Sequence, residues 1–192
     1  MDIPYTADKR PDTGVSNATL GLWLFLASEA MLFGSLFSAY ALLRSGAAAW
    51  PDQSTLINIP LGAINTLILL ASSFTIARAR RAAPDASPTM LVYTAVLGAV
   101  FLGIKAFEWS EKLAAGLTPA MNNFLGLYYA MTGLHALHLL GGVLVVAHLA
   151  GPGAPMRVTA PARYASRVHV TALYCHFVDA IWIVLFAVLY LL

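Results

Sequence analysis

The sequence predicts an all-α membrane protein, a bundle of five transmembrane helices. Hydrophobic residues make up 59% of the 192-residue chain and charged residues only 10%, whereas soluble domains carry about 25% charged residues. Five segments each offer the roughly 20 mainly apolar residues that a transmembrane helix needs. Proline, glycine and arginine gather between these segments, where they end helices outside the lipid.

The five expected helices are separated by chemically distinct breaks. They cover residues 17–43, 59–77, 89–109, 122–149 and 168–192. The first and fourth start at asparagines suited to cap a helix, Asn17 and Asn122. The first ends before a Pro51–Asp52 turn, the second at an arginine-rich segment, and the third before a loop containing Gly116. Three prolines precede the fifth, so we expect it to begin at Val168.

The helices form one domain, residues 17–192, after a polar tail at residues 1–16. The tail has no apolar core, so we expect no cleavable signal peptide. Lysine and arginine in short loops mark the cytoplasmic side of a membrane protein. On the side of the N-terminus lie eight of them: Lys9, Arg10, Arg78, Arg80, Arg81, Arg157, Arg163 and Arg167. The other side holds Arg44 and Lys112, so we expect a cytoplasmic N-terminus and a C-terminus outside.

Aromatic residues fall near the ends of the expected helices. They are Trp50, Trp109, Tyr128 and Tyr190. Amphipathic rings concentrate at both membrane surfaces, so we expect these four to form aromatic belts.

Seven ionisable side chains lie inside the expected helices: Glu29, Lys105, Glu108, His135, His138, His176 and Asp179. A charge near the middle of a bilayer costs at least a few kcal/mol, so such residues face protein, water or a bound head group. Glu29 lies near the midplane of the first helix. It is either a proton carrier or partner of a lipid head group, or a protonated carboxyl bonded to a neighbouring helix.

The other six residues form three pairs spaced i, i+3, which places each pair on one helix face. For Lys105 and Glu108, near the outer end, we favour a structural ion pair in which Lys105 extends toward the surface. His135 and His138 could bind a metal or a haem only with a further ligand, and His176 is the only other deep histidine that could supply it. For His135 and His138 we therefore favour interhelical hydrogen bonds or contacts with a lipid head group over metal or haem binding. His176 and Asp179 are interpreted as a structural pair, because a catalytic pair would need a nucleophile.

Chemistry alone leaves three classes open. The chain is a transporter using Glu29 and Lys105, a haem-binding membrane anchor using His135 and His176, or a non-catalytic subunit of a larger complex. The net charge of +2 is too small to indicate nucleic acid binding, and no nucleotide-binding glycine loop or zinc-protease motif is present. The single cysteine, Cys175, excludes an internal disulfide and a multi-cysteine metal site.

Five strings point further. They are LGLWLFLASEAMLF (20–33), INTLILLASSFT (64–75), FLGIKAFEW (101–109), FLGLYYAMTGLHALHLLGG (124–142) and YCHFVDAIWIVLF (174–186). In this order they resemble the helices of subunit III of haem-copper respiratory oxidases, the cytochrome c oxidase subunit 3 family. The resemblance covers nearly all of the chain from Leu20 onward. It is to the five-helix bacterial form, which lacks a leading helix pair, and it departs at Cys175, where the family often has tryptophan.

The resemblance implies an accessory subunit without a redox, metal or catalytic site, in a proton-pumping terminal oxidase of the bacterial inner membrane. Haem and copper would reside in partner subunits I and II, with this chain packed on subunit I, supporting proton uptake and binding phospholipid in an interhelical cleft. Glu29 matches the carboxyl of that cleft, and His138 and His135 match histidines near a head group. His176 and Asp179 match a polar pair of the last helix.

The electron donor to the complex is expected to be cytochrome c, because the family motif here carries glutamate at position 29. A quinol oxidase and a nitric oxide reductase-associated relative are the alternatives within the same fold. A respiratory supercomplex is a further possible assembly.

Overall fold

The computed structural model describes residues 13–83 and 88–192. Five of its helices are long and apolar enough to cross a membrane: α1 (Asn17–Gly46), α3 (Ile59–Ala82), α4 (Thr89–Ala114), α5 (Asn123–Ala150) and α7 (Pro161–Phe186), which continues into the π-helical turn η1 (Ala187–Leu191). The short helices α2 (Gln53–Leu56) and α6 (Met156–Thr159) lie in connections. The prediction of an all-α protein with five membrane-spanning helices is confirmed. Most of the predicted tail, residues 1–12, lies outside the described residues.

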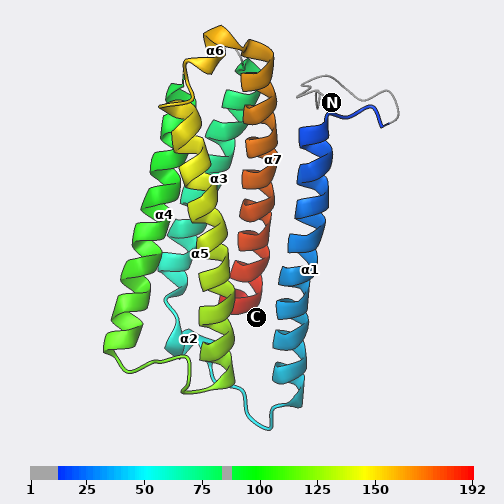
Figure 1. The fold of residues 1–192 in the computed structure, drawn as a ribbon. Coiled ribbons are helices and arrows are strands. Elements are labelled where there is room, and N and C mark those ends of the chain that lie inside the picture. The colour runs from blue at the N-terminus through cyan, green and yellow to red at the C-terminus, as the bar shows by residue number, and fades with distance from the viewer. Residues whose placement is uncertain (1–12, 84–87) are drawn as a thin grey trace.

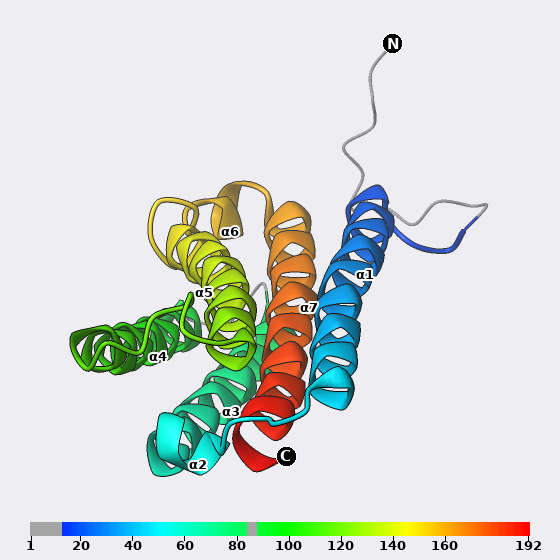
Figure 2. The same ribbon diagram turned by 90° about the horizontal axis from the view of Figure 1, so that it is seen from below.

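The long helices run side by side, with α6 and the start of α1 at one end of the bundle and α2 at the other (Figure 1). Seen along the bundle, α1 lies at its edge beside α7 (Figure 2). Its contacts are chiefly with α7 and α5. The buried residues of α1 are Leu26, Phe33 and Tyr40, which are seven residues apart and therefore form one narrow stripe. Most of the apolar surface of α1 consequently faces away from the protein.

The helix starts agree in part with the sequence. The Asn122 side chain accepts a hydrogen bond from the Leu125 amide, so the predicted cap of α5 is confirmed. The cap of α1 is Ser16 and not Asn17, because the Ser16 hydroxyl accepts from the Thr19 amide. The start expected at Val168 is wrong, since α7 begins at Pro161. Proline fits the first turn of a helix, where its missing N–H would have no partner.

The helix ends also extend beyond the expected positions. The second long helix, α3, continues to Ala82, and α4 continues to Ala114. Arg80 and Arg81 therefore lie in the last turn of α3, where basic side chains interact favourably with the helix dipole. Lys112 lies in α4 and is 7% exposed, so its expected place in a loop is wrong.

Small residues set the spacing between helices. A Cβ atom on Gly142 of α5 would lie 3.3 Å from the Tyr174 ring and 3.6 Å from Cys175 Sγ, both on α7. A Cβ atom on Gly98 of α4 would lie 2.5 Å from Cγ2 of Val143 on α5. Glycine lets two membrane helices approach closely at such points. The same contact explains how Cys175 is accommodated, because its small side chain packs against Gly142.

Candidate functional site

Glu29 and His138 meet between α1 and α5. The Glu29 Oε2 atom lies 2.7 Å from His138 Nε2, and both side chains are largely buried, at 13% and 14% exposure. The ring of Phe33 contacts the imidazole edge-on, with centroids 5.3 Å apart. The Tyr174 hydroxyl of α7 donates to the His138 backbone carbonyl at 2.9 Å. This arrangement joins three helices around one acid–imidazole pair.

The geometry fixes how protons are shared in this pair. His138 Nδ1 lies 2.8 Å from the Leu134 carbonyl oxygen, which only accepts hydrogen bonds, so Nδ1 carries a proton. One further proton between Nε2 and the Glu29 carboxyl completes the second hydrogen bond. The pair is then either a carboxylate with an imidazolium or a carboxylic acid with a neutral imidazole. Both forms have no net charge, which suits a group inside a membrane.

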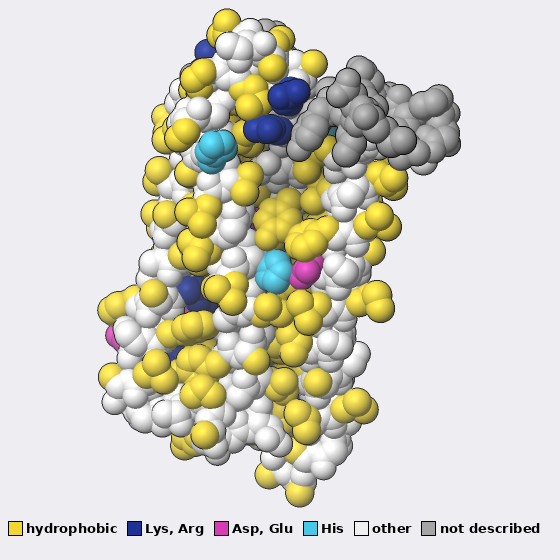
Figure 3. Space-filling model, viewed as in Figure 1, with side chains coloured by type: hydrophobic (Ala, Val, Ile, Leu, Met, Phe, Trp, Pro, Cys, Tyr) yellow, Lys and Arg dark blue, Asp and Glu magenta, His cyan; other side chains and the backbone are white. Residues whose placement is uncertain are grey.

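An apolar groove adjoins the pair. A cavity of about 320 Å³ lies between α1, α5 and α7, and its lining residues are Leu22, Phe25, Gly141, Val145, Val170, Thr171 and Tyr174. In Figure 3 a histidine and an acidic side chain touch within a mainly hydrophobic surface between α5 and α1. The groove therefore has mainly apolar walls and lies next to one ionisable pair.

A second polar cluster is centred on Glu108 of α4. Its carboxylate is 2% exposed and lies 2.8 Å from the ammonium of Lys105, which confirms the predicted ion pair. The Tyr128 hydroxyl donates to Glu108 Oε1 at 2.8 Å, and the Tyr190 hydroxyl lies 3.1 Å from the same atom. Lys112 approaches Oε1 at 3.5 Å. Helices α4 and α5 and the turn η1 are thus held together by one carboxylate.

This cluster corrects two expectations. Lys105 does not extend to the surface: it is 3% exposed, and its ammonium bonds Glu108 and the Tyr190 hydroxyl and lies 4.9 Å from the centre of the Trp182 ring. Tyr128 and Tyr190 are 0% and 2% exposed, so they belong to the core and not to aromatic belts. Sequence reasoning missed their role as partners of Glu108. The sequence did contain a signal: each tyrosine lies near the end of an apolar helix, and a buried acid such as Glu108 needs hydrogen-bond donors of this kind.

His135 lies apart from the groove. It is 1% exposed, and its ring packs against Phe101 and Trp182 at centroid distances of 5.8 and 5.2 Å. Neither ring nitrogen has a hydrogen-bond partner among the described residues. The spacing from His138 is one helical turn, yet the two histidines point into different environments.

His176 and Asp179 are connected through a third residue. The Ser73 hydroxyl on α3 lies 2.8 Å from His176 Nδ1, and it also lies close to the Asp179 carboxyl. A hydroxyl can donate to a carboxylate and accept from an imidazole N–H at the same time. The polar pair of the last helix therefore fastens α7 to α3.

Within residues 13–83 and 88–192, no group of three or more His, Cys, Asp or Glu residues is placed to hold a metal ion. Glu29, Lys105, Glu108, Lys112, His138 and His176 instead bond one another, tyrosine and serine hydroxyls, or backbone carbonyls. Fold and sites together define a multi-pass helical membrane protein with polar contacts between its helices.

The chain belongs to the cytochrome c oxidase subunit III family, whose model matches residues 12–192. A cytochrome c oxidase subunit 3 of Thermostichus vulcanus is 39% identical, over 97% of this chain and 90% of that protein. A cytochrome c oxidase subunit 3 of Bacillus sp. (strain PS3) is 32% identical, over 97% and 95%. A cytochrome bo(3) ubiquinol oxidase subunit 3 of Pseudomonas aeruginosa is 31% identical, over 100% and 92%. The predicted resemblance is confirmed, and the chain is a subunit III of a haem-copper oxidase.

Proposed function

We propose that the chain is the accessory subunit III of a proton-pumping cytochrome c oxidase in a bacterial inner membrane. It packs on subunit I, supports proton uptake there, and leaves electron transfer to the haem and copper of subunits I and II. The distribution of basic residues supports a cytoplasmic N-terminus, because most described arginines lie at the bundle end where α1 begins.

The observation that carries the proposal is the Glu29–His138 pair beside the apolar groove. An acyl chain fits walls made by side chains such as Phe25, Val145 and Val170. When the shared proton resides on the imidazole, the pair is a zwitterion whose dipole can interact with the polar head group of a lipid. The groove therefore suits a phospholipid that fills the space between α1 and the rest of the bundle.

The same pair suits a supporting role in proton uptake. A carboxyl and an imidazole that share one proton exchange it over a short distance at no change in net charge. The lipid in the groove would keep α1 and α5 at a fixed separation, and hence keep this pair intact during turnover.

Cytochrome c is the proposed electron donor. The relative at 39% identity is named as a cytochrome c oxidase subunit, whereas the ubiquinol oxidase subunit is 31% identical. A quinol is the second candidate donor, because relatives of both kinds match nearly the whole chain.

The test begins with affinity purification of the chain from its native membrane in mild detergent. We expect a reduced-minus-oxidised haem spectrum from the complex, none from the isolated chain, and oxygen consumption driven by reduced cytochrome c rather than by ubiquinol. A haem spectrum retained by the isolated chain would favour the anchor class. Absence of haem from both samples, with substrate flux through vesicles containing the chain alone, would favour the transporter class.

The pair itself is tested with two variants. Glu29→Gln retains a hydrogen-bonding partner for His138, so we expect normal assembly but faster loss of activity during turnover. His138→Leu removes the polar pair beside the groove, so we expect fewer bound phospholipids by mass spectrometry. Loss of the whole complex in Glu29→Gln, or an unchanged lipid content in His138→Leu, would contradict the proposal.

A further inference from the structure

Lys112 is a buried cation that receives less compensation than its neighbour. Lys105 and Lys112 are 3% and 7% exposed, and both approach a single carboxylate, Glu108. Lys105 has the short contact, 2.8 Å, whereas Lys112 lies 3.5 Å from the nearer carboxylate oxygen. A charge-assisted hydrogen bond spans about 2.7–2.9 Å, so the longer contact is a weak one. The buried set of two cations and one anion therefore has one positive charge in excess.

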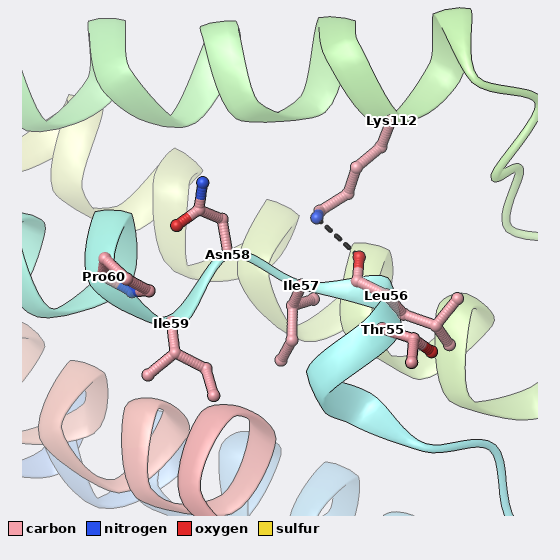
Figure 4. A pocket seen from close by; sticks show the side chains of 7 residues that line it. All are labelled: Thr55, Leu56, Ile57, Asn58, Ile59, Pro60 and Lys112. Carbon is pink, nitrogen blue, oxygen red and sulfur yellow. Dashed lines mark hydrogen bonds between the residues drawn. The ribbon is translucent and has the colours of Figure 1, made fainter.

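The short contact of Lys112 is to a backbone carbonyl. Its ammonium donates to the Leu56 oxygen at 2.8 Å, and the dashed line in Figure 4 marks this bond across the space between α4 and the end of α2. A carbonyl dipole accepts one N–H but does not neutralise the charge. An ammonium has three N–H donors, so Lys112 retains capacity for an anion.

A cavity is present at this point. It has a volume of about 460 Å³, and its lining residues are Thr55, Leu56, Ile57, Asn58, Ile59, Pro60 and Lys112. The side chains of Asn58 and Lys112 both extend into the space between the connecting segment and α4 (Figure 4). Helix α3, 24 residues long, begins beside the cavity at Ile59, and the positive end of its dipole adds to the field of Lys112.

The location and lining indicate the kind of anion. Lys112 lies near the end of α4, and Ile59 begins α3, so the cavity lies where two membrane-spanning helices end and lipid phosphates are found. Its polar groups stand beside aliphatic side chains, which matches a phosphate followed by a glycerol ester. Glu111 is adjacent in sequence but exposed, so water and salt screen its charge far more than they screen Lys112.

We infer that this cavity is a second lipid site, in which Lys112 binds the phosphate of an anionic phospholipid between α2, α3 and α4. The site is separate from the groove at Glu29 and His138, and it is built from residues of this chain alone. Its test therefore does not depend on the identity of the electron donor or on the role of the groove.

The experiment counts lipids on the chain purified with its native partners. The complex is exchanged into nanodiscs containing phosphatidylglycerol or phosphatidylcholine, recovered in mild detergent, and analysed by native mass spectrometry. We expect Lys112→Gln to lose one phosphatidylglycerol per chain and to retain phosphatidylcholine as the unchanged protein does. Arg44→Gln is the matched control, because it removes a cation at the same end of the bundle from a residue that does not line this cavity.

A second variant keeps the proposal falsifiable if Lys112→Gln fails to assemble. Asn58 caps α3 by accepting from the Leu61 amide at 3.0 Å, and aspartate caps helices equally well. Asn58→Asp therefore keeps the fold and the cavity volume while adding a negative charge that repels phosphate. We expect it to lose the same phosphatidylglycerol, whereas Asn122→Asp, which makes the same change at the cap of α5, retains it.

Two results would overturn the inference. One is an equal phosphatidylglycerol count in Asn58→Asp and the unchanged protein. The other is a phosphatidylglycerol count that is unchanged in Lys112→Gln although that variant binds added inorganic phosphate more weakly than the unchanged protein does, which would show that the cavity binds a free anion and not a lipid.

Discussion

Removing the carboxylate at Glu108 tests whether the buried cluster is held by charge or by hydrogen bonds. In Glu108→Gln, Lys105 loses its partner at 2.8 Å, Lys112 loses its partner at 3.5 Å, and two tyrosine hydroxyls lose a charged acceptor. The glutamine oxygen can still accept one of these bonds. Shape and volume change little, so the effect reports the charge.

The two explanations predict different magnitudes. Hydrogen bonds between membrane helices contribute on average about 0.6 kcal/mol each, so the loss of the two tyrosine bonds alone would lower the free energy of unfolding by roughly 1 kcal/mol. Leaving a buried charge without its partner costs about 3–5 kcal/mol. Since Lys105 and Glu108 are only 3% and 2% exposed, we expect the larger value.

A double-mutant cycle provides the control. Lys105→Met leaves Glu108 with both tyrosines and Lys112, so we expect a smaller loss, about 1–3 kcal/mol. The double variant removes both charges and is expected to be more stable than Glu108→Gln alone, because apolar groups can replace a buried ion pair at little cost. Equilibrium unfolding in mixed micelles measures all four proteins. A loss near 1 kcal/mol in Glu108→Gln, or a double variant less stable than both single variants, would refute the reasoning.

Two further predictions concern packing. Gly98→Ala should lower the free energy of unfolding by about 1–3 kcal/mol, because the new Cβ would lie 2.5 Å from Val143 Cγ2. Adding Val143→Ala to this variant should restore much of the lost stability. Gly103→Ala on the same helix, where the new Cβ meets open space, should raise the free energy of unfolding by up to about 1 kcal/mol. A measured loss in Gly103→Ala equal to that in Gly98→Ala would assign the effect to the helix and not to the contact. His135→Phe should be neutral or stabilising by up to about 2 kcal/mol, because the buried ring nitrogens have no partner among the described residues; a large loss in thermal stability would reveal a partner that the described geometry lacks.

The sequence predicted those features that depend on one helix at a time. Length and composition were sufficient for five spanning helices, since each needs about 20 apolar residues whatever its neighbours are. The pairing of Lys105 with Glu108 followed from their i, i+3 spacing. Family strings indicated that Glu29 and His138 both belong to the site, but no spacing rule connects residues that are 109 positions apart.

The starts and ends of helices were predicted less well. Pro161 was taken to interrupt the last connection, yet it occupies the first turn of α7. Lys112 was assigned to a loop because of its charge, yet it lies in α4 and reaches the Leu56 carbonyl. In both cases the prediction used the residue type alone. It was wrong because the residue has a specific role at that position, as the first helical residue for Pro161 and as a donor to a carbonyl for Lys112.

The tertiary structure alone decided which faces of the helices meet. Helices in lipid are apolar on all sides, because the surrounding chains are as apolar as a protein core, and the sequence pattern therefore does not distinguish an inward from an outward face. Close approaches such as Gly98 against Val143 select the packing. That packing then brings Tyr190 to Glu108, 82 positions away, and Ser73 of α3 to His176 of α7. The sequence determined that polar groups had to be paired inside the membrane, and the packing of the helices determined which groups form each pair.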